Sequence, residues 1–305
     1  MIESLRDSSP DCSILVVSSS TEGQTILRAM RAGAKEFLTP PIRVEDLVGA
    51  LERISSAKFG SGDGKTRTCH MIAVAGATGG VGTTSLAVNL GCILASDSKN
   101  TVALIDLDLS LGDADVFLDT IPDYTLVDVA QNIARLDFTL LKRSLTKHTS
   151  GLYLLPRPVQ LQDAALINPD DLTRVFGLLK ATFSHLIIDL SKSYNELDMV
   201  AMKAAKDVLL VTQLDLPCLR NVVRLLMSFG DVDGLKDKVR IVMNRVGLDS
   251  GQISLKKAQE TMGKEIFWQV PNDYRTMVEV RNNGVPLIEQ APKAGITQSM
   301  ISLAE

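Results

Sequence analysis

The segment that decides the fold reads AGATGGVGTTS and covers residues 75–85. It follows an apolar run at residues 71–75 that predicts a buried strand, and it leads into an apolar pattern at residues 84–95 that predicts a long helix. In a glycine-rich turn between a strand and a helix, backbone amides and the helix N-terminus point at one spot and favour an anion there. The segment therefore predicts a phosphate-binding loop.

Two classes of ligand compete for this loop. The spacing Gly76-x-x-Gly79-x-x-Gly82 is that of a dinucleotide fingerprint in an NAD(P)-binding short-chain dehydrogenase, with Asp106 or Asp108 taking the ribose hydroxyls. Such enzymes need a Tyr-x-x-x-Lys pair. None is present, because the tyrosines are followed four positions later by other residues: Tyr124 by Asp128, Tyr153 by Arg157, Tyr194 by Asp198 and Tyr274 by Val278.

The second interpretation is a P-loop for a nucleoside triphosphate. The backbone around the phosphates would then come from Gly79, Gly80, Val81, Gly82 and Thr83, with Thr84 and Ser85 opening the helix. Thr84 would offer its hydroxyl to Mg²⁺. Later strand ends agree with this interpretation, since residues 101–107 deliver Asp106 and Asp108, residues 186–190 carry Asp189, and a third strand ends at Asn244 and Arg245.

The pattern of the remaining chain predicts an α/β fold, with a mostly parallel sheet flanked by helices. Short Val/Ile/Leu runs alternate with helical stretches, which is typical of strands buried on both faces. Strands are expected at residues 102–106, 152–155, 185–189, 207–212 and 239–244. We expect a βαβα segment at residues 1–57, a Ser/Gly-rich linker at 58–69 and the P-loop domain at 70–305.

Composition narrows the class of protein. A formal net charge of −4 in 305 residues gives no bulk reason to expect nucleic acid as a partner. The four cysteines have no metal-ligand spacing and suit a reducing cytoplasm. No apolar run reaches the roughly 20 residues that span a bilayer, so we expect a cytoplasmic protein whose membrane contact, if any, is indirect.

Several stretches resemble the ParA/MinD superfamily of deviant Walker ATPases. Within it they resemble the CpaE/TadZ branch, which positions tight-adherence (Flp) pilus machinery at a cell pole. The stretches are GGVGTTSLAVNLG (79–91), ALIDLDLSLGDADVFLD (103–119), HLIIDLSKS (185–193), TQLDLPCLRNVVRLL (212–226), VMNRV (242–246) and PNDYRTMVEVRNNGVPL (271–287). Residues 22–42, EGQTILRAMRAGAKEFLTPPI, resemble the second half of a receiver domain, without the strands that carry a phosphoacceptor aspartate.

The resemblance implies a set of site residues. ATP or ADP would bind with Mg²⁺, which Thr84, Asp106 and Asp189 would support, and Asp106 and Asp108 would be catalytic if the protein hydrolyses ATP. The adenine side would be formed by Asn244, Arg245, Pro271, Asn272 and Asp273.

The chain departs from the family at two lysines. The superfamily pattern is Lys-Gly-Gly-x-Gly-Lys-Thr, whose second lysine binds the β and γ phosphates and whose first reaches across a dimer. Thr83 and Thr78 stand at those positions here. A hydrogen bond to a charged group contributes about 1.5–3 kcal/mol, so the loss removes several kcal/mol of phosphate binding. Much of that loss would fall on the transition state.

The resemblance therefore implies a localisation factor for a pilus or secretion system, with little or no hydrolysis. Its partners would be a pilus or secretion ATPase, other pilus assembly proteins and a second copy in a homodimer, at a cell pole, without nucleic acid. An alternative is an active MinD-like ATPase stimulated by a partner, in which Arg245 or Arg275 replaces the missing charge. The dehydrogenase-like protein is the remote alternative.

Overall fold

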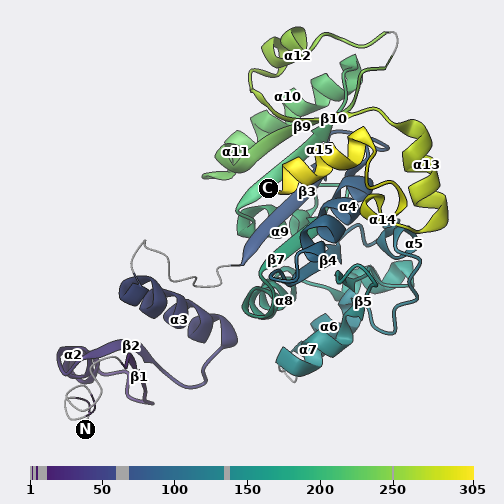
Figure 1. The fold of residues 1–305 in the computed structure, drawn as a ribbon. Coiled ribbons are helices and arrows are strands. Elements are labelled where there is room, and N and C mark those ends of the chain that lie inside the picture. The colour runs from purple at the N-terminus through teal and green to yellow at the C-terminus, as the bar shows by residue number, and fades with distance from the viewer. Residues whose placement is uncertain (1, 3–4, 6–11, 60–68, 134–137, 249–250) are drawn as a thin grey trace. The chain divides into compact units, whose positions relative to one another are not determined.

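The chain forms two compact units, Met1–Thr68 and Cys69–Glu305. The computed structural model describes residues 2, 5, 12–59, 69–133, 138–248 and 251–305 (Figure 1). Most of the expected linker at residues 58–69 lies outside the described residues.

Within residues 12–59, the smaller unit has two strands and two helices. Strand β1 (Ile14–Val17) pairs in parallel with β2 (Ala34–Leu38), and the helices are α2 (Gly23–Arg31) and α3 (Val44–Phe59). Helix α2 stops where Gly33 adopts a φ of 114°, a conformation that favours glycine.

The larger unit is built on an eight-stranded sheet with the order β10-β9-β8-β3-β7-β4-β6-β5. Every neighbouring pair is parallel except β5 and β6. The strands are β3 (His70–Gly76), β4 (Val102–Asp106), β5 (Thr146–Lys147), β6 (Tyr153–Leu155), β7 (His185–Asp189), β8 (Asp207–Thr212), β9 (Val239–Val246) and β10 (Ile266–Pro271). The predicted α/β class and mostly parallel sheet are confirmed.

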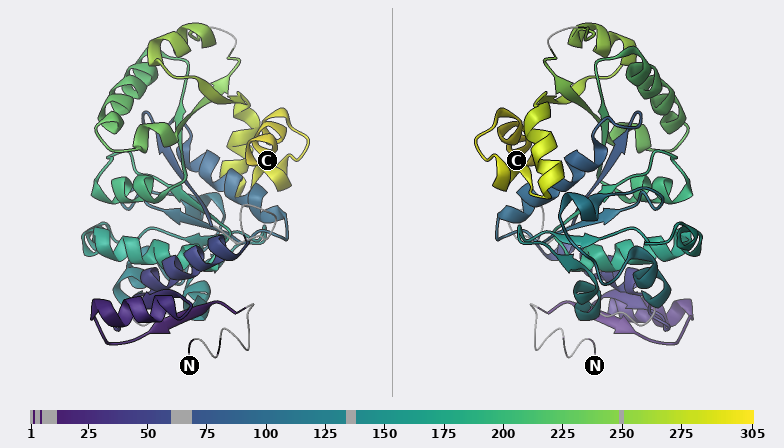
Figure 2. Two further views of the ribbon diagram at one scale, coloured as in Figure 1. Left: turned by 90° about the vertical axis from the view of Figure 1, so that its left-hand side faces the viewer. Right: turned by 90° about the vertical axis from the view of Figure 1, so that its right-hand side faces the viewer.

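Helices cover both faces of this sheet (Figure 2). They are α4 (Thr83–Ser96), α5 (Ala114–Phe117), α6 (Leu126–Asn132), α7 (Phe138–Ser144), η2 (Leu161–Leu166), α8 (Pro169–Thr182), α9 (Glu196–Ala204), α10 (Leu216–Gly230), α11 (Leu235–Lys238), α12 (Leu255–Met262), α13 (Tyr274–Asn283), α14 (Leu287–Gln290) and α15 (Gly295–Ala304). None of the helices within the described ranges is both long and apolar enough to cross a bilayer.

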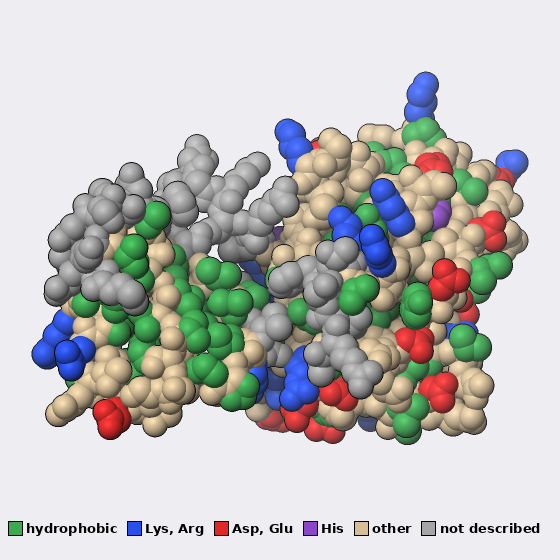
Figure 3. Space-filling model, turned by 90° about the horizontal axis from the view of Figure 1, so that it is seen from below, with side chains coloured by type: hydrophobic (Ala, Val, Ile, Leu, Met, Phe, Trp, Pro, Cys, Tyr) green, Lys and Arg blue, Asp and Glu red, His purple; other side chains and the backbone are tan. Residues whose placement is uncertain are grey.

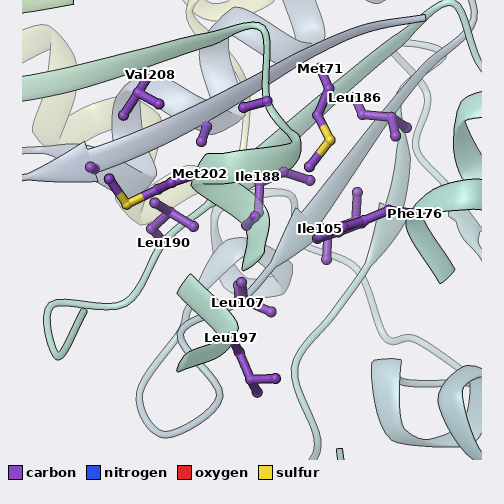
Figure 4. Close-up of a cluster of buried hydrophobic side chains, with 14 of the residues drawn as sticks. Met71, Ile105, Leu107, Phe176, Leu186, Ile188, Leu190, Leu197, Met202 and Val208 are labelled. Carbon is purple, nitrogen blue, oxygen red and sulfur yellow. The ribbon is translucent and has the colours of Figure 1, made fainter. Parts of the chain in front are cut away.

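In its described residues, the larger unit has two hydrophobic cores, one on each face of the sheet, because successive strand residues point to opposite faces. Val74, Leu104 and Ile187 belong to the core under α4 and α15. Their neighbours Ile105 and Ile188 belong to the other core, with Met71, Phe176 and Met202 among its members (Figure 4). The central strands are buried on both faces, which explains why their sequences are continuous apolar runs.

This topology gathers the predicted site at one edge of the sheet. Strand β3 lies between β7 and β8, and β4 lies beyond β7. Because the carboxyl ends of parallel strands meet at one edge, the loop after β3 lies beside the ends of β4 and β7. In the register of these strands Asp106 pairs with Asp189, and Asp189 with Val74.

Candidate nucleotide-binding site

The glycine-rich loop leaves β3 at Gly76 and enters α4 at Thr83. Gly80 and Gly82 have φ angles of 79° and 101°, which β-carbon-bearing residues rarely adopt. A Cβ on Gly82 would also lie 2.5 Å from the side-chain nitrogen of Asn244. That nitrogen donates a hydrogen bond to the Val81 carbonyl at 2.7 Å. The strand end at Asn244 therefore braces the loop.

Both threonines at the lysine positions contact atoms of their own chain. Thr83 is buried, and its hydroxyl lies so close to Gly76 that a Cβ there would collide with it. The hydroxyl of Thr78 lies 3.4 Å from the Cys218 sulfur in α10. Neither position brings a positive charge to the loop.

Asp106 is fully buried at the end of β4. Its carboxylate accepts backbone hydrogen bonds from Asp108 at 3.1 Å and Ala114 at 3.2 Å. Burial raises its pKa to about 7, against the lowering effect of these two amides. A Cβ on Gly112 would overlap the carboxylate, so the segment after β4 is wrapped closely around Asp106.

Asp189, at the end of β7, differs from Asp106 in accepting no backbone hydrogen bond. Among the described residues neither of its carboxylate oxygens has a partner at full hydrogen-bonding geometry, and the Thr84 hydroxyl is the neighbouring donor that acts on it. Asp189 is 1% exposed. Burial, followed by the negative charge of Asp106, raises its pKa well above the ordinary value, and the nearby Thr84 hydroxyl opposes this. A buried carboxylate without a full set of partners destabilises the folded state, and a bound cation would offset that destabilisation.

These oxygens fit Mg²⁺. Within the described ranges no three His, Cys, Asp or Glu side chains come together as a cluster that could hold a metal ion. Mg²⁺ seldom uses such a cage, because it usually takes one or two carboxylates and completes its shell with water and substrate phosphates. Thr84 with Asp106 and Asp189 offers that kind of partial shell.

The adenine-side residues line a pocket beside the loop. Its wall includes Asn244, Arg245, Pro271, Asn272 and Asp273, together with Gly82, Ser85, Val270, Tyr274, Met277 and Ile296. The structure thus brings together loop residues and the end of β10, which are far apart in the sequence. Adenine binding by this pocket stays a prediction.

Of the two arginines expected to replace the missing charge, Arg245 contacts the loop and Arg275 does not. Arg245 has a φ of 55° and donates from its guanidinium to the Gly80 carbonyl at 3.0 Å, so it supports the loop backbone. Arg275 is 92% exposed and pairs with Glu279 one turn along α13.

Lys192 is a candidate residue that the sequence reasoning missed. It follows β7, and its ammonium lies 3.9 Å from an Asp108 carboxylate oxygen. Its Cδ lies 3.7 Å from the position that a Cβ on Gly79 would take. The stretch HLIIDLSKS contains this lysine, but no spacing rule singles it out.

Tyr194 supports the same region. Its hydroxyl donates to the Gly76 carbonyl at 2.8 Å, and burial raises its pKa above the ordinary range. The Tyr194 phenol is thus used as a donor that holds the start of the loop.

A central strand, a glycine-rich loop and a helix, with carboxylates at two neighbouring strand ends, define a P-loop nucleotide-binding protein. Residues 72–283 match the CobQ/CobB/MinD/ParA nucleotide binding domain. The chain belongs to this family.

Named relatives are septum site-determining MinD proteins. The chain is 30% identical to that of Thermotoga maritima over 227 residues, covering 72% of this chain and 80% of the relative. It is 27% identical to that of Synechocystis over 227 residues, covering 72% and 82%.

Solved structures share the fold at low sequence identity. A ParA family ATPase from Chlorobium tepidum superimposes with a TM-score of 0.74 at 22% identity, covering 78% of this chain and 98% of that one. MinD from Pyrococcus horikoshii, complexed with Mg-ADP, gives 0.66 at 23% identity, covering 77% and 94%. The MinC:MinD complex of Aquifex aeolicus gives 0.65 at 22% identity, covering 77% and 94%.

Proposed function

We propose that the protein is a nucleotide-dependent switch that binds ATP or ADP with Mg²⁺ and hydrolyses ATP slowly or not at all. The observation that carries the proposal is the buried carboxylate of Asp189, which accepts no backbone hydrogen bond and lies beside the Thr84 hydroxyl. Positions 78 and 83 of the adjacent loop are neutral. The oxygen donors for the metal are retained, while the charges that stabilise a phosphoryl-transfer transition state are reduced.

Each retained residue has a distinct part in this proposal. Residues 79–85 would hold the phosphates through backbone amides, and Thr84, Asp106 and Asp189 would support Mg²⁺, which neutralises phosphate charge. Asp108 would orient a water molecule if hydrolysis occurs. The pocket with Asn244, Arg245 and residues 271–273 would take the base. The relative solved with Mg-ADP supports this choice of ligand.

The finer function that we propose is recruitment of other proteins. The resemblance to the CpaE/TadZ branch favours pilus assembly proteins at a cell pole, whereas the curated relatives named above act in septum placement. The solved MinC:MinD complex supports partner binding as a property of this fold. A homodimer stays part of the proposal, although Thr78, at the position of the cross-dimer lysine, contacts Cys218 of its own chain.

A partner-stimulated ATPase is the second candidate. Lys192, 3.9 Å from Asp108, favours it because a cation is present beside the loop despite the two threonines. This candidate predicts turnover that rises on addition of a pilus or secretion ATPase.

The test is nucleotide binding and turnover by the purified chain. We expect ATP to bind in a Mg²⁺-dependent way, and Thr84→Ala to weaken that binding about tenfold through loss of a metal contact. Thr182→Ala is the matched control. Thr182 is the last residue of α8, which leads into the start of β7, and therefore lies at the edge of the sheet opposite the loop. Failure to bind ATP would overturn the proposal, and so would rapid unstimulated turnover that Asp106→Ala abolishes.

A further inference from the structure

Lys192 lies beside the part of the loop that is expected to wrap the phosphates. Its aliphatic chain passes Gly79, with 3.7 Å between Cδ and the position of an added Cβ. Its ammonium lies 3.9 Å from Asp108, and the side chain is 54% exposed. The amine is therefore close to the loop and open to an incoming anion.

The segment that carries Lys192 is fixed on both sides. The fully buried carboxylate of Asp198 accepts hydrogen bonds from the Ser191 amide at 3.0 Å and the Ser191 hydroxyl at 2.6 Å. On the other side, Tyr194 donates to the Gly76 carbonyl at 2.8 Å. Since the residues before and after it are held in this way, the Lys192 backbone has a defined position relative to the loop.

The charges around the loop call for a cation. Three carboxylates, Asp106, Asp108 and Asp189, surround a site that is expected to take a polyphosphate, and the Thr78 and Thr83 positions give no compensation. The contact between Lys192 and Asp108 is long, and the lysine side chain is half exposed to water, so the contact contributes little stability. An ammonium on a flexible stem exchanges such a partner easily for a phosphate oxygen.

Arg245 is less suited to this task. Its guanidinium is already bonded to the Gly80 carbonyl at 3.0 Å, on the side of the loop that faces the base pocket. Moving it to a phosphate would break a contact that supports the loop itself.

We propose that Lys192 binds the terminal phosphates of the nucleotide from within the same chain and so replaces the missing loop lysine. The inference rests on the proposed nucleotide binding. When the Lys192 ammonium binds a phosphate oxygen, it leaves Oδ2 of Asp108, and this oxygen can then hold water, while Oδ1 keeps its bond from the Leu111 amide.

The test measures dissociation constants of ATP, ADP and AMP by calorimetry for the full chain and for Lys192→Met. We expect the affinity for ATP and ADP to fall about ten- to a hundredfold, the effect of losing one hydrogen bond to a charged group. The affinity for AMP should stay within about twofold, because AMP lacks the terminal phosphates that Lys192 would contact. Lys192→Arg should retain most of the ATP affinity.

Lys206→Met is the matched control, because Lys206 is exposed and precedes β8 at the opposite end of the sheet. Equal weakening of ATP and AMP by Lys192→Met would indicate a structural role and overturn the inference. Unchanged ATP affinity would overturn it as well, while leaving the proposed nucleotide binding intact. If the unmodified chain binds no ATP, the proposed function fails, and this inference fails with it.

Discussion

Asp189→Asn should stabilise the protein in the absence of nucleotide and metal. The residue is 1% exposed, and its carboxylate oxygens have no partner at full hydrogen-bonding geometry among the described residues. The Thr84 hydroxyl is the neighbouring donor that acts on it, and an asparagine oxygen in the same place can keep that contact. Asparagine is nearly isosteric and carries no charge. The wild-type residue must instead either ionise in a buried site or take up a proton on folding.

The magnitude follows from the pKa of Asp189, which burial and the Asp106 charge raise well above the ordinary value of 3.8. Between that value and the raised one, the folded state binds more protons than the unfolded state, so the free energy of unfolding falls as pH rises. At 1.36 kcal/mol per pH unit above 3.8, the destabilisation caused by Asp189 is at most about 5 kcal/mol at about pH 7.5 and at most about 2 kcal/mol at about pH 5. Asparagine does not titrate. Its advantage should therefore be greater at the higher pH by up to about 3 kcal/mol.

The assay is urea unfolding of wild type and variant at both pH values, without nucleotide or Mg²⁺. The fluorescence of Trp268, the only tryptophan, reports on the larger unit because this residue lies in β10. An advantage that is equal at the two pH values, or larger at the lower one, would refute the reasoning. Adding ATP and Mg²⁺ should reverse the order, because the cation would stabilise only the carboxylate.

Two further substitutions test the architecture of the site. Gly82→Ala should destabilise the protein by about 2–3 kcal/mol and weaken ATP binding, through a φ of 101° and the crowding of Asn244. Gly234→Ala is its control, with a φ of 68° and no atom within 4 Å of an added Cβ, and equal losses for the two variants would contradict the contact with Asn244. Asp198→Ala should lower the free energy of unfolding by about 3 kcal/mol, because it leaves the buried Ser191 donors without their acceptor. Asp198→Ala should also weaken ATP binding, because Ser191 precedes Lys192. An unchanged free energy of unfolding in urea would show that the Ser191–Asp198 hydrogen bonds do not stabilise the protein.

Much of the larger unit could be predicted from apolar runs. Strands β4, β7 and β8 have the predicted bounds, because fully buried parallel strands leave a continuous pattern in the sequence. Strand β5 has two residues and is too short to give one. Strand β10 is not among the predicted strands, because it alternates between exposed and buried residues, with Phe267 51% exposed and Val270 buried, and so leaves no continuous apolar run.

The site was predictable where it depends on strand ends. Asp106 and Asp189 each close an apolar run, and parallel pairing then puts them side by side. Lys192 was not predictable in this way, because its position depends on a buried cap at Asp198, a feature of tertiary packing. The contacts that Thr78 and Thr83 make within the chain could not be predicted either. The sequence shows that threonine stands where the family has lysine, but it does not show where the threonine hydroxyl lies.

Strand β3 has a neighbour along each of its edges, β7 on one and β8 on the other. Its amide protons are thus among those that exchange with solvent only when the sheet itself opens, whereas the two-residue β5 and the terminal β10 can detach by local fraying. We therefore expect the strand that carries the glycine-rich loop to be among the slowest of the sheet to exchange.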